Sequence, residues 1–85
     1  MPPLAPDLIH VRFFAVLREQ AGTSTIELST AAATPAELYA ELQTSHRLTF
    51  RAELLKVAVN ERYVPMDSPL HAGDQVVFIP PVAGG

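Results

Sequence analysis

The sequence predicts an α+β domain in which about five strands form a small mixed sheet and one main helix crosses it. The first observation is that stretches with apolar residues at every second position, the period of a half-buried strand, lie on both sides of one helical stretch. The second is that this helical stretch opens with a capping signal. Turn residues separate the stretches into the order strand, strand, helix, strand, short strand, strand.

The first half of the chain predicts a hairpin followed by the helix. A strand is expected over residues 9–16 (IHVRFFAV), then a short helical turn (LREQA) that ends at Gly22, then a second strand at residues 25–28 (TIEL). The sequence Thr34-Pro35-Ala36-Glu37 is typical of a capping box with proline at the first helical position. The helix is therefore expected from Pro35 to about Gln43, with an apolar face of Leu38, Tyr39 and Leu42.

The second half of the chain is richer in strand signals. The expected elements are an irregular stretch with a helical turn after His46, a strand at 55–60, a turn at 60–62, a short edge strand at 63–64 that Pro65 ends, and a strand at 75–80. Eight apolar residues are assigned to the core: Val11, Phe13, Leu38, Leu42, Val57, Val59, Val76 and Phe78.

Length and composition limit what so small a domain can do. The 85 residues predict one domain at 8–80, with a flexible leader at 1–7 and a functional tail at 81–85, and leave no room for a deep catalytic cleft. The net charge of −3 gives no electropositive surface for nucleic acid or an anionic membrane. No stretch is long and apolar enough to span a membrane, and the start resembles no signal peptide, so we expect a cytoplasmic protein. Without cysteine, any sulfur chemistry must use another group.

The sequence ends on Gly84-Gly85, and this end is where we expect the chemistry. Two residues without side chains adopt backbone angles closed to other residues and pass through a channel too narrow for a Cβ atom. The carboxylate of Gly85 is thereby able to reach a buried site in another protein. A frayed end or a cloning scar remains the alternative explanation of the same two residues.

The order of elements is that of the β-grasp, or ubiquitin-like, fold, and several motifs resemble one family within it. The stretches VRFFAVLRE, VAVN, PLHAGDQVVFIPP and the terminal VAGG are similar to the small, sulfur-carrying subunits of molybdopterin synthase. The resemblance runs from about Ile9 to Gly85. The pair Pro80-Pro81 favours this branch over the carriers that supply sulfur to the thiazole of thiamine and over ubiquitin-related modifiers.

The resemblance implies that the protein carries sulfur without binding a cofactor stably. An adenylyltransferase partner would use ATP to activate the carboxylate of Gly85, and sulfur would replace AMP to give a thiocarboxylate. The large, catalytic subunit of molybdopterin synthase would receive the tail and pass the sulfur to cyclic pyranopterin monophosphate, which forms molybdopterin. Alone, the chain would not be a catalyst. The tail residues expected to enter the partner, beside Gly84 and Gly85, are Pro80, Pro81, Val82 and Ala83.

Strand parity predicts a second contact surface for partners. With Val11 and Phe13 facing the core, Phe14 faces the other side of the sheet, where a large apolar ring is unexpected. We expect Phe14, Ile79 and Tyr63 to form an apolar patch beside the tail, a mark of a protein interface. Strand twist or a bulge that turns these side chains inward is the alternative.

Other functions stay open at this point. A sulfur carrier for thiamine thiazole or tRNA thiolation, a ubiquitin-like modifier of lysines, and a passive interaction module all fit the fold. The sole lysine, Lys56, lies within a predicted strand and offers few points for self-conjugation. The histidines His10, His46 and His71 are scattered without the spacing of metal ligands, so no metal site is expected.

Overall fold

The computed structural model describes residues 8–81, which form one five-stranded mixed sheet with two helices and a single 3₁₀ turn in the described range. The elements are β1 (Leu8–Phe13), α1 (Ala15–Ala21), β2 (Thr25–Ser29), α2 (Pro35–Ser45), η1 (Ala52–Leu54), β3 (Lys56–Val59), β4 (Arg62–Val64) and β5 (Gln75–Ile79). The predicted α+β class and order of elements are confirmed.

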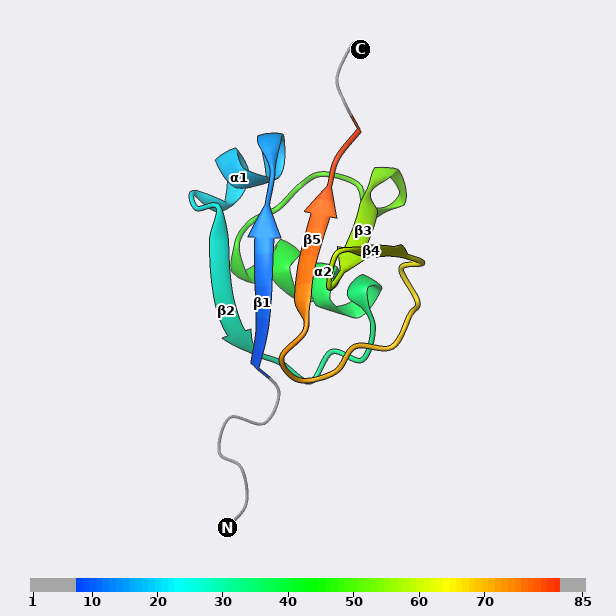
Figure 1. Ribbon diagram of the computed structural model, residues 1–85. Helices are drawn as coiled ribbons and strands as arrows, with labels where there is room; N and C mark the ends of the chain where they lie inside the picture. Colours follow the sequence, from blue (N-terminus) through cyan, green and yellow to red (C-terminus); the bar gives the residue numbers. More distant parts are fainter. Residues whose placement is uncertain (1–7, 82–85) are drawn as a thin grey trace.

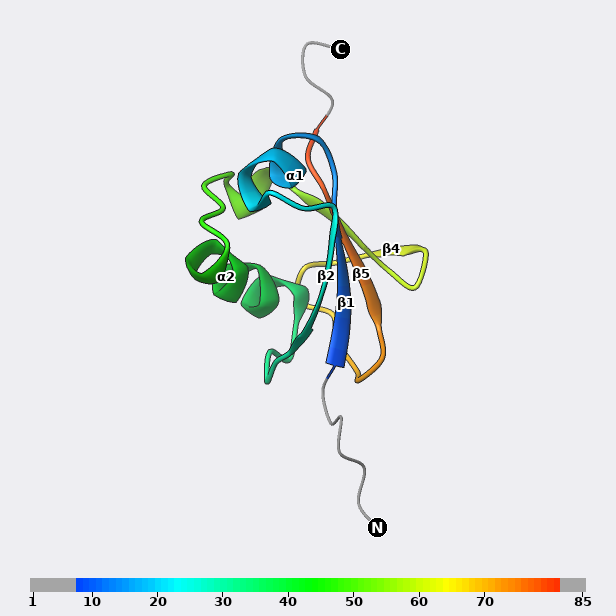
Figure 2. The same ribbon diagram turned by 90° about the vertical axis from the view of Figure 1, so that its left-hand side faces the viewer.

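The strands lie in the order β2-β1-β5-β3-β4, so the first and last strands of the chain are central neighbours (Figure 1). Strands β1 and β5 run parallel, and every other neighbouring pair is antiparallel. Both helices lie on the same side of the sheet (Figure 2). No helix among residues 8–81 covers the opposite face, called here the outer face (Figures 1 and 2).

Strand register assembles the core beneath α2. Val11 lies opposite Val76, and Phe13 opposite Phe78, which is in turn opposite Val57 on the other side. The ring of Tyr39 from α2 packs on the ring of Phe78, with centroids 5.1 Å apart. Alternate residues of three strands thus meet one face of the helix, as strand and helix periods require.

Seven of the eight predicted core residues are buried, and Val59 is the exception. Val59 is half-buried and only packs against the edge of the core. It is the last residue of β3 and lies opposite the exposed Arg62 of the edge strand β4. The apolar face predicted for the helix, Leu38, Tyr39 and Leu42, is fully buried.

The start of α2 confirms the capping signal with one difference in its hydrogen bonds. The Thr34 hydroxyl oxygen accepts a 3.2 Å hydrogen bond from the backbone N–H of Glu37. The Glu37 carboxylate reaches back to the backbone N–H of Ala33, at 2.9 Å, rather than to that of Thr34 as in the usual capping box. The helix continues two residues past the predicted Gln43, to Ser45.

The first strand is shorter than predicted. It ends at Phe13 instead of Val16, because Ala15 adopts a left-handed φ of 52° and starts α1. This turn brings Leu17 back under the sheet, where it is completely buried. Gly22 ends α1 as predicted, with a φ of 78° that favours glycine.

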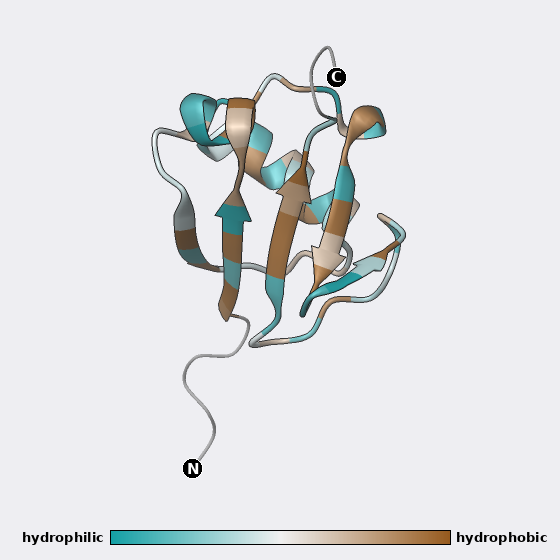
Figure 3. Cartoon of the chain, turned by 45° about the horizontal axis from the view of Figure 1, so that its top comes forward, coloured by the Kyte–Doolittle hydropathy of each residue, from teal (hydrophilic) through white to brown (hydrophobic). Residues whose placement is uncertain are grey.

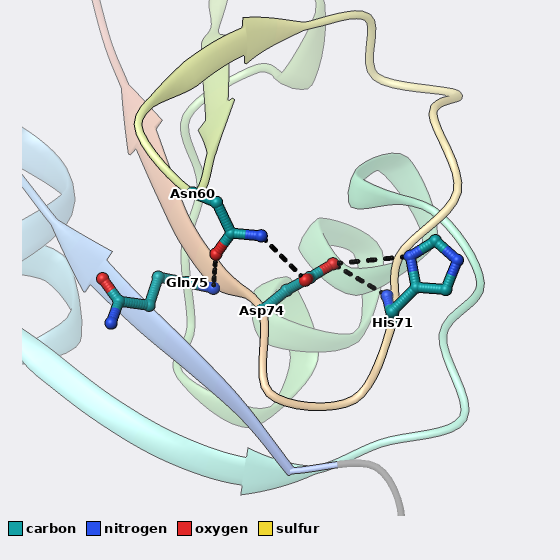
Figure 4. A network of polar contacts seen from close by, with 4 residues as sticks. All are labelled: Asn60, His71, Asp74 and Gln75. Carbon is teal, nitrogen blue, oxygen red and sulfur yellow. Dashed lines mark hydrogen bonds and ion pairs between the residues drawn. The ribbon is translucent and has the colours of Figure 1, made fainter.

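At the end of the sheet where β5 begins, a side-chain network joins the turn between β3 and β4 to the start of β5 (Figure 4). Asn60 and Glu61 form the turn with left-handed φ values of 52° and 72°, so the predicted turn at 60–62 is one residue too long and Arg62 belongs to β4. The Asn60 side chain donates to Asp74 at 2.9 Å and accepts from the backbone N–H of Gln75 at 3.0 Å.

Candidate interface at the tail end of the sheet

Three chain segments meet at the edge of the sheet where β5 ends. Strands β1 and β5 are parallel, so both finish at this edge, and β3 runs opposite to β5, so it begins there. Phe14 therefore lies on one side of the end of β5 and Leu54 with Leu55 on the other. We call this edge the tail end, because Pro80 and Pro81 continue from β5 here.

Phe14 and Ile79 follow the Phe13–Phe78 pair by one residue and face away from the core. The ring of Phe14 is 42% exposed, which confirms the predicted exposure, and Ile79 is half-buried. The guanidinium carbon of Arg12 lies 5.9 Å from the centre of the Phe14 ring, within cation–π range. Figure 3 shows apolar colour along β5 and where the chain passes from β1 to α1.

Tyr63 lies farther from these two residues than the sequence analysis implied. It is 73% exposed on the edge strand β4 and pairs with Ala58 of β3, which pairs with Val77 of β5. Strand β3 thus separates Tyr63 from Ile79. The three predicted residues lie on the same outer face, with the half-buried Val77 and the buried Ala58 between them. We call the set Phe14, Ile79, Val77, Ala58 and Tyr63 the outer patch.

Two exposed residues at the tail end were not assigned to an interface by the sequence. Lys56 lies directly opposite Ile79 in register and is exposed on the outer face, next to the outer patch. Its exposure could have been predicted from the alternation of the strand, because the apolar residues Leu55 and Val57 on either side face the core and are buried. Leu54, in η1, is 52% exposed. No sequence periodicity identified it, because a 3₁₀ turn of three residues has too few positions to show one.

The predicted tail is described only at its base. Pro80 is buried and Pro81 is exposed. Val82, Ala83, Gly84 and Gly85 lie outside the described residues, so the predictions about them stay predictions. The strand that precedes this base is paired with β1 as far as Phe78 and with β3 as far as Ile79.

Two histidines make separate, local contacts with acidic residues. His10 pairs with Glu27 at 3.1 Å on the outer face, and His71 lies 4.0 Å from Asp74 in the network of Figure 4. Within residues 8–81, no three histidine, aspartate or glutamate side chains gather as a metal site would require. No helix in this range is long and apolar enough to cross a bilayer.

The five-stranded sheet, the helix that crosses it and the parallel central pair β1 and β5 define a ubiquitin-like β-grasp domain. The chain belongs to the ThiS family, whose model matches residues 11–85. A curated relative from Escherichia coli (strain K12), a molybdopterin synthase sulfur carrier subunit, is 40% identical over 81 residues, covering 92% of this chain and 100% of the relative.

Solved structures agree with this assignment. One is the complex of subunits 1 and 2 of the molybdopterin-converting factor from Helicobacter pylori, with a TM-score of 0.63, 28% identity, and coverage of 92% of this chain and 99% of that chain. Another is SAMP1 from Haloferax volcanii, with a TM-score of 0.74, 26% identity, and coverage of 92% and 99%. The family resemblance inferred from the motifs is thereby confirmed.

Proposed function

We propose that this chain is the sulfur carrier subunit of a molybdopterin synthase. The observation that carries the proposal is the 40% identity to the Escherichia coli carrier subunit over that protein's whole length. The likeness to a chain of the Helicobacter pylori complex supports the same assignment, since that structure pairs the carrier fold with a second subunit. The outer patch beside the tail base is the kind of apolar surface that a protein partner covers.

The reacting group in this proposal is the carboxylate of Gly85. A carboxylate resists nucleophiles because of its negative charge and poor leaving group, so it must be activated. An adenylyltransferase joins it to the α-phosphate of ATP and releases pyrophosphate. A sulfur nucleophile then attacks the acyl carbon, the bond to AMP breaks, and a thiocarboxylate remains. No cysteine of the carrier is needed, in keeping with its absence from the sequence.

The carrier presents this sulfur to the large, catalytic subunit of the synthase. There the thiocarboxylate sulfur attacks cyclic pyranopterin monophosphate, and water then cleaves the bond between the glycyl carbon and sulfur, which returns the carboxylate of Gly85. Two such transfers supply the two sulfur atoms of the molybdopterin dithiolene. The domain supplies position while the carried group supplies the reactivity. In this proposal the carrier holds no stable cofactor, ATP belongs to the activating partner, and neither nucleic acid nor a membrane takes part. The proposal includes a cytoplasmic location for the carrier.

Reconstitution tests the proposal. The carrier is combined with its activating enzyme, ATP, a sulfide source, the large subunit and cyclic pyranopterin monophosphate, and molybdopterin is measured. Deletion of Gly85 should abolish product formation while the circular dichroism spectrum and melting temperature stay unchanged. Full activity of the deleted chain would show that the tail does not carry the sulfur.

The intact mass of protein isolated from its native cell separates the other candidate functions. A carrier gains the mass difference between one sulfur and one oxygen atom, a modifier of lysines is found in isopeptide adducts, and a passive module is unchanged. A carrier for thiamine thiazole or tRNA thiolation would acquire the same sulfur, but it would fail to support molybdopterin formation in the reconstituted assay.

A further inference from the structure

A hollow beside the outer patch is lined by apolar residues, a tyrosine and one charged side chain, that of Lys56. It has a volume of about 560 Å³ and lies along β3 and β4, near the point where the ladder between them stops at the Val57–Val64 pair. Beyond this pair, Pro65 has no backbone N–H with which to extend the ladder. The lining residues are Leu55, Lys56, Val57, Tyr63, Val64, Pro65 and Met66, and Lys56 is the one cation among them.

Lys56 has no acidic partner within the part of the chain that the structure describes. The ion pairs found there join His10 to Glu27, Arg51 to Glu53 and His71 to Asp74. The side chain of Lys56 is instead exposed, while its cross-strand neighbour Ile79 is apolar and immediately precedes the tail base. This cation therefore borders the outer patch, beside Ile79, and lines the same hollow as Tyr63.

We propose that this hollow receives an acidic side chain of the large synthase subunit, whose carboxylate pairs with Lys56 when the tail enters that subunit. The inference rests on the proposed function and adds to it the chemistry of the contact. The apolar lining residues fit a partner segment in which the acidic residue is flanked by apolar ones. Lys56 would thus act as a specificity determinant beside the tail and not as a catalytic residue.

The argument for a carboxylate follows from desolvation. A partner that covers Ile79 and Tyr63 also removes water from the ammonium beside them, and an uncompensated buried charge opposes binding strongly. A carboxylate placed against it compensates that cost and rejects partners that lack one. The overall charge of the chain is −3, so a local cation is also the feature that an acidic segment would distinguish from the rest of the surface.

Binding of the large subunit to four variants tests the inference, with affinity measured by titration calorimetry at low and high salt. Lys56→Met keeps an apolar stem without the charge and should lose about tenfold in affinity, Lys56→Glu should lose more, and Lys56→Arg should lose least. The matched control is Arg47→Met, which removes a cation from the loop that follows α2. It should bind as the wild type does. The wild-type affinity should also fall more steeply with salt than that of Lys56→Met.

The sole lysine allows a second measurement on the unmodified chain. An amine-acetylating reagent has one side-chain target in this sequence, Lys56, besides the N-terminal amine. In the free carrier Lys56 should react rapidly. With the large subunit at about ten times its dissociation constant, about nine-tenths of the carrier is bound, so acetylation of Lys56 should slow about tenfold, while the N-terminal amine serves as the internal reference. Peptide mass spectrometry measures the modification of both sites.

The outcomes separate this inference from the proposed function. If wild-type carrier does not bind the large subunit at all, the proposed function fails and the inference fails with it. If the wild type binds but Lys56→Glu binds equally well, or if Lys56 is acetylated equally fast in the complex, the acidic contact alone is refuted. Low reactivity of Lys56 in the free carrier would also refute it, because the site would already be occupied by the chain itself.

Discussion

Phe13 and Phe14 are neighbours in the sequence, yet they serve opposite faces of the sheet. Phe13 is 1% exposed and lies opposite Phe78 in the core, whereas Phe14 is 42% exposed beneath the guanidinium of Arg12. The pair therefore offers two chemically identical truncations, one that tests folding and one that tests binding.

Phe14→Ala should weaken binding to the large subunit while leaving the isolated domain stable. An aromatic anchor at an interface hot spot costs at least about 2 kcal/mol when truncated, or roughly a thirtyfold loss of affinity. Phe13→Ala should instead lower the free energy of unfolding by about 3 to 5 kcal/mol, because it leaves a cavity in the core. Calorimetry and thermal melts of both variants provide the comparison. Unchanged affinity of Phe14→Ala, or a melting temperature that collapses like that of Phe13→Ala, would contradict the assignment.

Gly84→Val tests the narrow-channel argument for the tail. Gly84 lies outside the described residues, so this prediction depends on the sequence alone. A side chain at this position adds a Cβ atom and restricts φ, which should hinder entry into a channel shaped for bare backbone even though the carboxylate of Gly85 remains. Sulfur transfer by the variant should fail in the reconstituted assay, with the fold intact. Activation and transfer at wild-type rates would show that the channel tolerates a side chain.

Tyr39 should give the domain a stability that declines in alkali. Its side chain is fully buried and its hydroxyl donates a 2.8 Å hydrogen bond to the carbonyl oxygen of Phe50. Burial raises the pKa of Tyr39 above its ordinary value of 10.0, so the folded state holds the proton more tightly than the unfolded state. The stability that protonated Tyr39 contributes to the folded domain is therefore fully present below about pH 10. It is lost as the pH rises through the folded-state pKa.

Tyr39→Phe isolates this effect. At neutral pH the variant should lose about 1 kcal/mol of unfolding free energy with the hydrogen bond. Above about pH 10 its stability should decline less steeply than that of the wild type, as measured by urea unfolding across the range. Tyr63→Phe removes an exposed hydroxyl on the outer face and serves as the control, which should keep the wild-type decline. Parallel declines for Tyr39→Phe and the wild type would exclude Tyr39 as the titrating group.

Features of the fold that depend on local periodicity could be predicted from the sequence. Strand parity separated Phe13 from Phe14, and the Thr34 signal located the start of α2. The end of β1 was missed because Phe14 and Ala15 prolong its apolar run. There the chain adopts a left-handed φ at Ala15 so that Leu17 reaches the core, and that requirement is tertiary.

The candidate interface was predictable in part for the same reason. Exposure of Phe14 and Tyr63 followed from parity and edge position, but their separation depends on strand order, which places β3 between Tyr63 and Ile79. The position of Lys56 beside Ile79 depends on the register of β3 against β5. Register between strands that are far apart in sequence is a property of the assembled sheet and is not contained in either strand's own pattern.

Asp74 should contribute strongly to stability at the end of the sheet opposite the tail end. It is 8% exposed, and its carboxylate accepts hydrogen bonds from the Asn60 amide at 2.9 Å and from the backbone N–H of His71 at 2.8 Å (Figure 4). These bonds tie the β3–β4 turn, with its two left-handed residues, to the loop that precedes β5. Hydrogen bonds to a charged acceptor are stronger than those between neutral groups.

Asp74→Ala should therefore lower the unfolding free energy by about 2 to 3 kcal/mol, because it removes two such bonds and leaves donors without their partner. Urea unfolding measures the loss. The control is Asp67→Ala, which removes an exposed carboxylate from the same loop and should change stability by less than about 0.5 kcal/mol. Because the network lies at the opposite end of the sheet from Phe14 and Lys56, Asp74→Ala should keep wild-type affinity for the large subunit at temperatures where it is folded. Equal stability of the two aspartate variants would show that the network contributes no more than a solvent-exposed carboxylate does.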